Sequence, residues 1–183
     1  GDVCDLFQGL CINAKTKHLL VAKSALPLLR IKDLRSNTAE QFLAESGWPK
    51  NARVEESEII YTRTGQIGLV FRGRAGVLHN NCFKVKPRPL LNVDSLFWWL
   101  QSPAFRARIT RLASKAAQPD ITHTLFKAQS IHVPPRRYQD AAISLIDRML
   151  EETRRLAALY EQKLAALEAL KKSLLHQAFT GQL

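Results

Sequence analysis

The sequence has little cysteine and no long hydrophobic run, and both shortages exclude classes of protein. Its three cysteines, Cys4, Cys11 and Cys82, show no C-x-x-C spacing, which argues against a disulfide framework and against a zinc site. No apolar run approaches the roughly 18 residues that span a membrane, and no signal peptide opens the chain. We therefore expect a cytoplasmic protein with no membrane partner.

Sequence signatures of catalysis are missing as well. Methyl transfer to a base would need an Asn/Asp-Pro-Pro-aromatic pocket, but Pro134-Pro135 follows Val133 and precedes Arg136. No phosphate-binding G-x-x-x-x-G-K-[ST] loop appears. Glu161-Gln162-Lys163 has the letters of a nuclease metal site but falls within a helical repeat. The sequence predicts no catalytic residue, no metal ligand and no cofactor bound by this chain.

Positive charge is abundant and unevenly distributed. Residues 1–133 contain 19 Lys and Arg against 10 Asp and Glu, a net charge of +9, whereas residues 134–183 contain 8 against 6, a net charge of +2. A strongly basic globular part is typical of proteins that bind a polyanion, most often nucleic acid. The charge therefore favours nucleic acid as a partner of residues 1–133, although charge alone does not exclude a merely soluble basic domain. The candidate major-groove contacts given below favour double-stranded DNA as that partner.

Residues 134–183 predict one long helix with a coiled-coil seam. Pro134-Pro135 suits the first turn, and Gly181 suits the left-handed residue that ends a helix. About forty residues at roughly 1.5 Å each would form a rod near 60 Å long, which needs a second helix or its own domain to cover its apolar face. Apolar positions alternate in steps of three and four. The seam comprises Ile146, Met149, Thr153, Leu156, Tyr160, Lys163, Leu167, Leu170 and Leu174.

The remaining sequence predicts an α+β domain that is rich in strands before it becomes helical. Asp94–Gln101 and a segment from Pro103 through Lys115, with Ser102 as its N-cap, favour helices. Alternation and glycine punctuation favour short strands. The expected strands are residues 28–34, 58–64, 68–72, 76–78, 81–85 and 131–133.

Several polar side chains of this domain could contact DNA. Arginine can donate two hydrogen bonds to guanine, and Asn or Gln can pair with adenine, so such residues in turns between strands suit base reading. Three basic residues at i, i+3 and i+7 on one helical face suit phosphate contacts, although each could equally be a solvated polar group. The candidates are Arg63, Gln66, Arg72, Arg74, His79, Asn80, Asn81, Arg108, Arg111 and Lys115.

The order of these elements resembles one half of the specificity subunit of type I restriction–modification systems. Leu29-Arg30-Ile31-Lys32-Asp33-Leu34 and Arg63-Thr64-Gly65-Gln66-Ile67-Gly68 are similar to motifs of its target recognition domain. Ile131-His132-Val133-Pro134-Pro135 with Gln139 resembles the junction that follows this domain. The most specific similarity is the terminal Leu170-Lys171-Lys172-Ser173-Leu174-Leu175 with Ala178-Phe179. Arg136 and Tyr138 depart from the family's junction, and the recognition loops vary too widely to transfer base-reading residues.

The resemblance implies a DNA reader without catalysis, with a recognition domain in residues 1–133 and a spacer helix in residues 134–183. That helix would form an antiparallel coiled coil with a second helix, from the other half of the subunit or from a second copy of the chain. Methylating and restriction subunits would join it, bringing S-adenosylmethionine, ATP and Mg²⁺. Because the chain begins with Gly1 and not with Met, we expect a fragment or a trimmed chain. One domain with one helix would be either part of a full subunit or a natural half-subunit that dimerises through its helix. A stand-alone dimeric DNA-binding regulator is the alternative that a basic domain with a dimerising helix leaves open.

Overall fold

The computed structural model describes residues 1–114 and 119–181. It divides the chain into two compact units, Gly1–Gln139 and Asp140–Leu183. Lys115, one of the predicted DNA-contacting residues, lies outside the described residues. The β-rich first unit and the helical second unit confirm the predicted α+β class.

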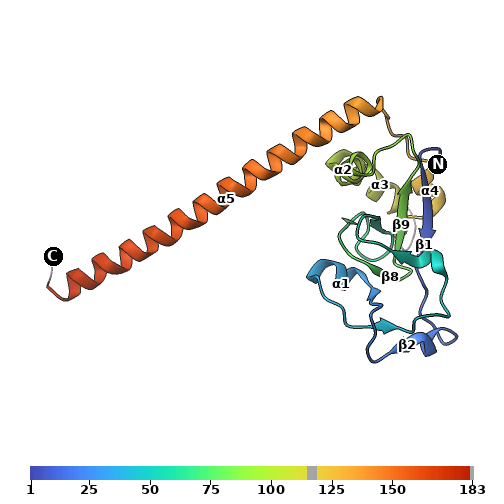
Figure 1. Cartoon of the computed structure of the whole chain (residues 1–183), viewed down its shortest axis with the longest axis horizontal. Coiled ribbons are helices and arrows are strands. Elements are labelled where there is room, and N and C mark those ends of the chain that lie inside the picture. Colours follow the sequence, from blue (N-terminus) through green and yellow to red (C-terminus); the bar gives the residue numbers. More distant parts are fainter. Residues whose placement is uncertain (115–118, 182–183) are drawn as a thin grey trace. The chain divides into compact units, whose positions relative to one another are not determined.

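A four-stranded antiparallel sheet in the order β1-β9-β6-β7 forms the centre of the first unit (Figure 1). The strands are β1 (Cys4–Gln8), β6 (Ile59–Thr62), β7 (Val70–Phe71) and β9 (Cys82–Pro87). Successive side chains of a strand point to opposite faces, so Ile60 and Tyr61 of β6 enter two different cores. The central strand β6 is buried along its whole length.

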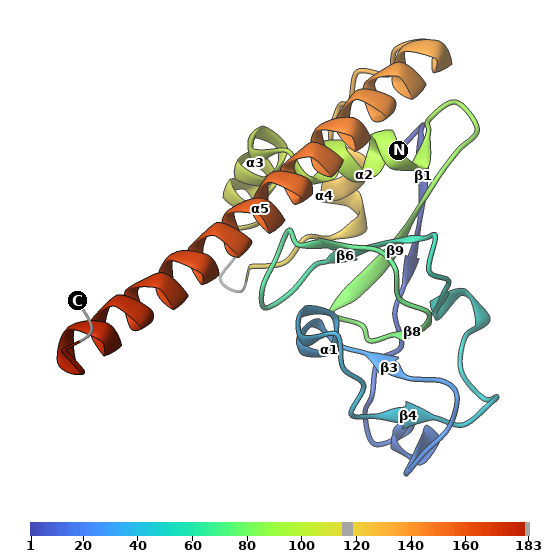
Figure 2. The ribbon, with the colours of Figure 1, turned by 60° about the vertical axis from the view of Figure 1, so that its left-hand side comes forward.

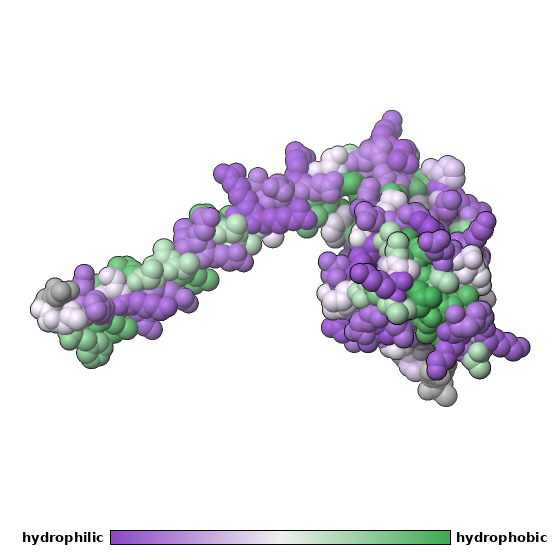
Figure 3. Space-filling view, turned by 60° about the horizontal axis from the view of Figure 1, so that its bottom comes forward, coloured by the Kyte–Doolittle hydropathy of each residue, from purple (hydrophilic) through white to green (hydrophobic). Residues whose placement is uncertain are grey.

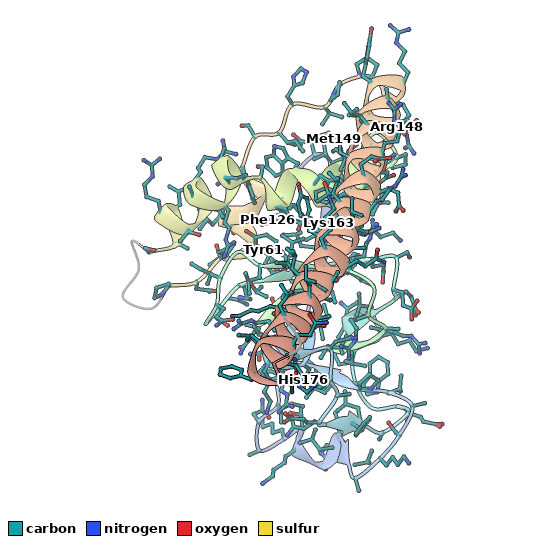
Figure 4. The ribbon with its side chains drawn as sticks, turned by 90° about the vertical axis from the view of Figure 1, so that its left-hand side faces the viewer. Tyr61, Phe126, Arg148, Met149, Lys163 and His176 are labelled. Atoms are coloured by element: carbon teal, nitrogen blue, oxygen red, sulfur yellow. The ribbon has the colours of Figure 1, made fainter. Side chains whose placement is uncertain are left out.

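Three helices pack against one face of this sheet (Figure 2). They are α2 (Val93–Gln101), α3 (Pro103–Ala113) and α4 (His123–Lys127). Each begins at an N-cap residue whose side chain accepts a hydrogen bond from a free backbone N–H of the first turn. The capping residues are Asn92, Ser102 and Thr122. The core beneath them is aromatic. The centroid of the Tyr61 ring lies 5.4 Å from that of Phe83 and 4.9 Å from that of Phe126, and Figure 4 labels Tyr61 and Phe126.

Smaller elements cover the opposite face of the sheet. Strand β8 (Gly76–Leu78) pairs in parallel with β3 (Leu28–Leu29) and antiparallel with β5 (Arg53–Val54). Helix α1 (Ile31–Ser36) follows β3, and its Leu34 joins Ile60 in the second core. The other elements are the pair β2 (Leu20–Val21) and β4 (Phe42–Leu43) and the 3-10 turns η1 (Lys17–Leu19) and η2 (Lys50–Ala52).

Helix α5 (Arg136–Phe179) contains 44 residues and begins in the first unit. Gln139, in its first turn, is buried, with Oε1 accepting a hydrogen bond from the Asn92 backbone N–H and Nε2 donating to the carbonyls of Leu90 and Pro134. The described helix ends before Gly181, whose φ of 71° is left-handed as predicted. No helix within the described residues is both long and apolar enough to cross a membrane.

Two of the predicted strands are wrong. The strand expected over residues 28–34 stops at Leu29, because the Asp33 carboxylate accepts a hydrogen bond from the Arg30 backbone N–H and starts helix α1 instead. Residues 131–133, also expected to be a strand, are irregular and pair with no strand among the described residues. Strand β8 has the predicted bounds, and β6, β7 and β9 differ from the predictions at their ends. Strand β1 and helix α4 were not predicted.

Candidate DNA interface

Arg63 lies at the end of the central sheet, at the start of a turn, and is held by two other side chains. Its Nε donates to Asp120 Oδ1 at 2.9 Å, its Nη2 donates to Asp120 Oδ2, and its Nη1 donates to Gln8 Oε1 at 3.1 Å. Gln8 ends β1, and its Nε2 donates to the Asn80 carbonyl at 2.7 Å. The arginine fork, which the sequence suggested for guanine, is therefore occupied by a carboxylate and an amide of the domain itself.

The segment His79-Asn80-Asn81 lies beside Gln8, where the chain crosses itself closely. A Cβ on Gly9 would stand 2.3 Å from the His79 carbonyl oxygen, so only glycine fits there. His79 Nδ1 faces the Asn81 backbone N–H at 3.4 Å, and burial, together with the nearby positive Arg30, lowers the pKa of His79 below its ordinary value. The imidazole is therefore neutral at pH 7 and can contribute one N–H donor to a ligand.

The turn between β6 and β7 projects Gln66 into solvent. The buried Thr62 hydroxyl donates to the Gln66 carbonyl and accepts from the Leu69 backbone N–H at 2.9 Å, which fixes the turn from inside. Gly65 and Gly68 have φ of 72° and 77°, a conformation that side chains rarely adopt. The exposed Gln66 side chain accepts a hydrogen bond through Oε1 from Arg35 Nη1 of α1, at 2.9 Å.

Helix α3 borders the other side of the same turn. A Cβ on Gly68 would stand 3.6 Å from the Thr110 hydroxyl and 3.7 Å from Cγ of Arg106. Arg106 and Arg111 are exposed on this helix, whereas Arg108 is half-buried, with its Nη2 donating to the Ser130 carbonyl at 3.3 Å. The turn thus lies between Arg35 on α1 and Arg106 on α3, an arrangement that suits one reading group flanked by phosphate contacts.

Arg74 and Arg72, two further candidates, have partners within the domain. Arg74 caps helix α1, since its guanidinium donates to the Asn37 side chain at 2.7 Å and to the Thr38 carbonyl at 2.7 Å. Arg72 forms an ion pair with Asp94 of α2, and its guanidinium carbon lies 4.8 Å from the centroid of the Phe97 ring. Both arginines join elements of the domain and leave less of their hydrogen-bonding capacity to a ligand.

The predicted residues therefore fall into separate groups. Arg63, Asn80 and Asn81 gather at the end of the sheet, while Gln66 stands on the turn beside it. Sequence reasoning missed Gln8, Arg35, Arg106 and Asp120, which lie far from the turn in sequence and carry no local signal. Only the fold brings them to it. Among the described residues no group of three His, Cys, Asp or Glu side chains could hold a metal ion.

The predicted seam runs along the second unit as an uncovered apolar stripe. Met149, Leu156, Tyr160, Leu167, Leu170 and Leu174 are each between 45 and 62 % exposed, and Figure 3 shows apolar patches among hydrophilic ones on α5. The two polar positions of the seam contact other residues of the same helix. The Thr153 hydroxyl donates to the Met149 carbonyl at 2.7 Å, and Lys163 Nζ lies 5.6 Å from the centroid of the Tyr160 ring.

Comparison with known proteins identifies the protein family of this chain. Residues 1–169 match the family model described as the type I restriction modification DNA specificity domain. The chain therefore belongs to this family of DNA specificity domains, which confirms the resemblance read from the sequence. No curated protein matches it.

Three solved structures share the fold at low sequence identity. One, from a study of complex assembly and conformational transition of the type I R-M system, has a TM-score of 0.76 at 19% identity. The HsdS subunit from Thermoanaerobacter tengcongensis gives 0.69 at 18%, and the S subunit from M. genitalium gives 0.54 at 16%. They cover 100%, 100% and 94% of this chain, which spans only 45%, 44% and 42% of theirs.

Proposed function

We propose that this chain recognises one half of a bipartite DNA site within a type I restriction–modification complex. The single observation that carries the proposal is the family match, which spans both the basic domain and most of α5. Residues 1–133 would act as the target recognition domain and residues 134–183 as the spacer. The turn that carries Gln66, flanked by α1 and α3, is the part of the domain best suited to enter a groove, since exposed donors on a rigid support can read base edges.

Helix α5 would form an antiparallel coiled coil with a second helix, from the other half of a specificity subunit or from a second copy of the chain. The exposed leucines of the seam support this pairing, because so long an apolar stripe is otherwise left in water. Two copies related by a two-fold axis would read an interrupted palindrome, since the symmetry of the half-sites follows that of the protein. A chain with less than half the length of the compared structures is consistent with either partner.

The partners that complete the activity would be methylating and restriction subunits. S-adenosylmethionine, ATP and Mg²⁺ would bind to those subunits and not to this chain, whose role is to choose the sequence. A specificity component without its own chemistry can direct methylation and cleavage only through such an assembly.

Methylome sequencing tests the proposal. Co-expression of the chain with cognate methylating subunits should produce adenine methylation at one new sequence motif, and the methylating subunits alone should produce none. Absence of a motif would overturn the proposal. Sequence-selective gel shifts by the isolated chain, combined with no methylation, would instead favour a stand-alone DNA-binding regulator.

A further inference from the structure

In the hydrogen bond between Arg35 and Gln66, the choice of donor and acceptor determines which DNA base the two side chains can bind. Arg35 Nη1 donates and Gln66 Oε1 accepts, at 2.9 Å. Both side chains are exposed, and among the described residues the Arg35 guanidinium has no other hydrogen-bond or ion-pair partner. The guanidinium thus keeps most of its N–H donors for a ligand, while the amide oxygen of Gln66 is partly occupied.

We propose that Arg35 is the residue of this surface that reads a guanine, and that Gln66 is the positioning residue that holds its guanidinium. This proposal rests on DNA recognition by the same surface and deepens it. It also reverses the roles expected from the sequence, where Gln66 was a base-reading candidate and Arg35 was not considered.

The chemistry of the pair favours guanine over adenine. Guanine presents two acceptors, O6 and N7, in the major groove, and a planar guanidinium matches both at once. Adenine presents one donor and one acceptor, which a glutamine reads best when its oxygen is free. Because Gln66 Oε1 already accepts from Arg35, the two side chains together offer mainly donors.

The support of Arg35 is rigid enough for such reading. Helix α1 is fixed at its start by Asp33, whose carboxylate is fully buried and accepts from Arg30 Nε at 2.7 Å and from Arg30 Nη2 at 3.0 Å. It is fixed at its end by Arg74, which binds Asn37 and the Thr38 carbonyl. Arg74 therefore stabilises the helix that carries Arg35.

The turn that carries Gln66 is supported as well. Thr62 bonds it from inside, and a Cβ on Gly65 would lie 3.9 Å from the Ile31 side chain of α1. The Gly65 backbone therefore lies close to α1. A long arginine whose orientation is fixed by a second side chain loses less freedom when it binds, which favours a specific contact.

Binding of the full chain, assembled with its cognate methylating subunits, to a library of randomised DNA duplexes tests the pair. The wild-type chain should show one position at which guanine is preferred. Arg35→Met should reduce that preference roughly 10- to 100-fold, as expected for loss of one bidentate contact. Arg35→Lys should lose the preference while retaining more affinity, because lysine keeps the charge without the fork.

Substitutions of Gln66 separate positioning from reading. Gln66→Leu should weaken the guanine preference, and Gln66→Glu should preserve it, because a carboxylate still accepts from Arg35. Arg111→Met, the same chemical change on an exposed arginine of α3, should weaken binding to all sequences alike.

Three outcomes would overturn the inference. An Arg35→Met variant that binds more weakly but with unchanged preferences would make Arg35 a phosphate contact. If the DNA position whose preference is lost in Arg35→Met prefers a base other than guanine, the assignment of guanine to Arg35 is refuted. Loss of an adenine preference in Gln66→Glu would show that Gln66 itself reads the base. If the wild-type chain showed no sequence preference at all, the proposed function itself would fail.

Discussion

Gln139 and Asn92 tie the first turn of helix α5 to the start of helix α2. The Gln139 side chain is only 2 % exposed, and its Oε1 accepts from the Asn92 backbone N–H at 2.8 Å. The same amide donates to the carbonyls of Leu90 at 3.0 Å and Pro134 at 2.8 Å. One side chain thus satisfies three backbone groups where the domain passes into the helix.

Replacing Gln139 by leucine should destabilise this junction. Buried backbone groups would lose their partners, and each such group costs about 1–3 kcal/mol. Urea unfolding should give a lower free energy of unfolding for Gln139→Leu. The matched control is Gln162→Leu on the exposed part of α5, which should unfold like the wild type. Equal stability of Gln139→Leu and wild type would show that the junction tolerates the loss.

Stability should depend on pH through Asp33. Burial would raise the pKa of this carboxylate, but the hydrogen bonds from Arg30 prevail and hold it below its ordinary value. A carboxylate whose pKa is lower in the folded protein stabilises it above the ordinary pKa near 3.9 and loses this contribution as the pH falls through the folded value. Asp33→Asn should therefore be less stable than wild type at pH 7, and the difference should shrink towards pH 2. A gap in the free energy of unfolding that stayed constant with pH would exclude this linkage.

We expect the Arg63–Asp120 ion pair to stabilise the folded domain and Arg63 not to read a base. Both side chains are about one quarter exposed, and the contact is bidentate. In a double-mutant cycle of Arg63→Met and Asp120→Asn, the two substitutions should couple by about 0.5–3 kcal/mol in the free energy of unfolding. Additive effects, together with altered DNA preference in Arg63→Met alone, would instead assign Arg63 to base reading.

The seam of α5 should mediate association. Replacing Leu156, Leu167 and Leu170 by Asp should abolish pairing with a second copy, since charges would be buried against apolar side chains. Light scattering would measure the mass in solution. Asp at Ala158, Ala165 and Ala169, which are exposed on the other side of the helix, should leave association unchanged. A dimer that persisted in the leucine variant would place the interface elsewhere.

The sequence correctly predicted the features that depend on a long period or on a helix cap. The heptad spacing and Pro134-Pro135 predicted a long terminal helix, and α5 has 44 residues. Ser102 before Pro103 predicted the start of α3, because a cap and its helix are neighbours in the chain. The order of motifs identified the family. These features depend on contacts within a few residues, which a sequence displays directly.

Tertiary structure decided which polar side chains remain available to a ligand. Arg63, Arg72 and Arg74 looked free in sequence, yet each meets a partner at least 20 residues away. Arg35 was not among the predicted residues, and it lies on helix α1, which begins at Ile31 within the segment expected to be a strand. Long-range hydrogen bonds form only when strands and helices pack, so the availability of a side chain is a property of the fold and not of its neighbours in sequence.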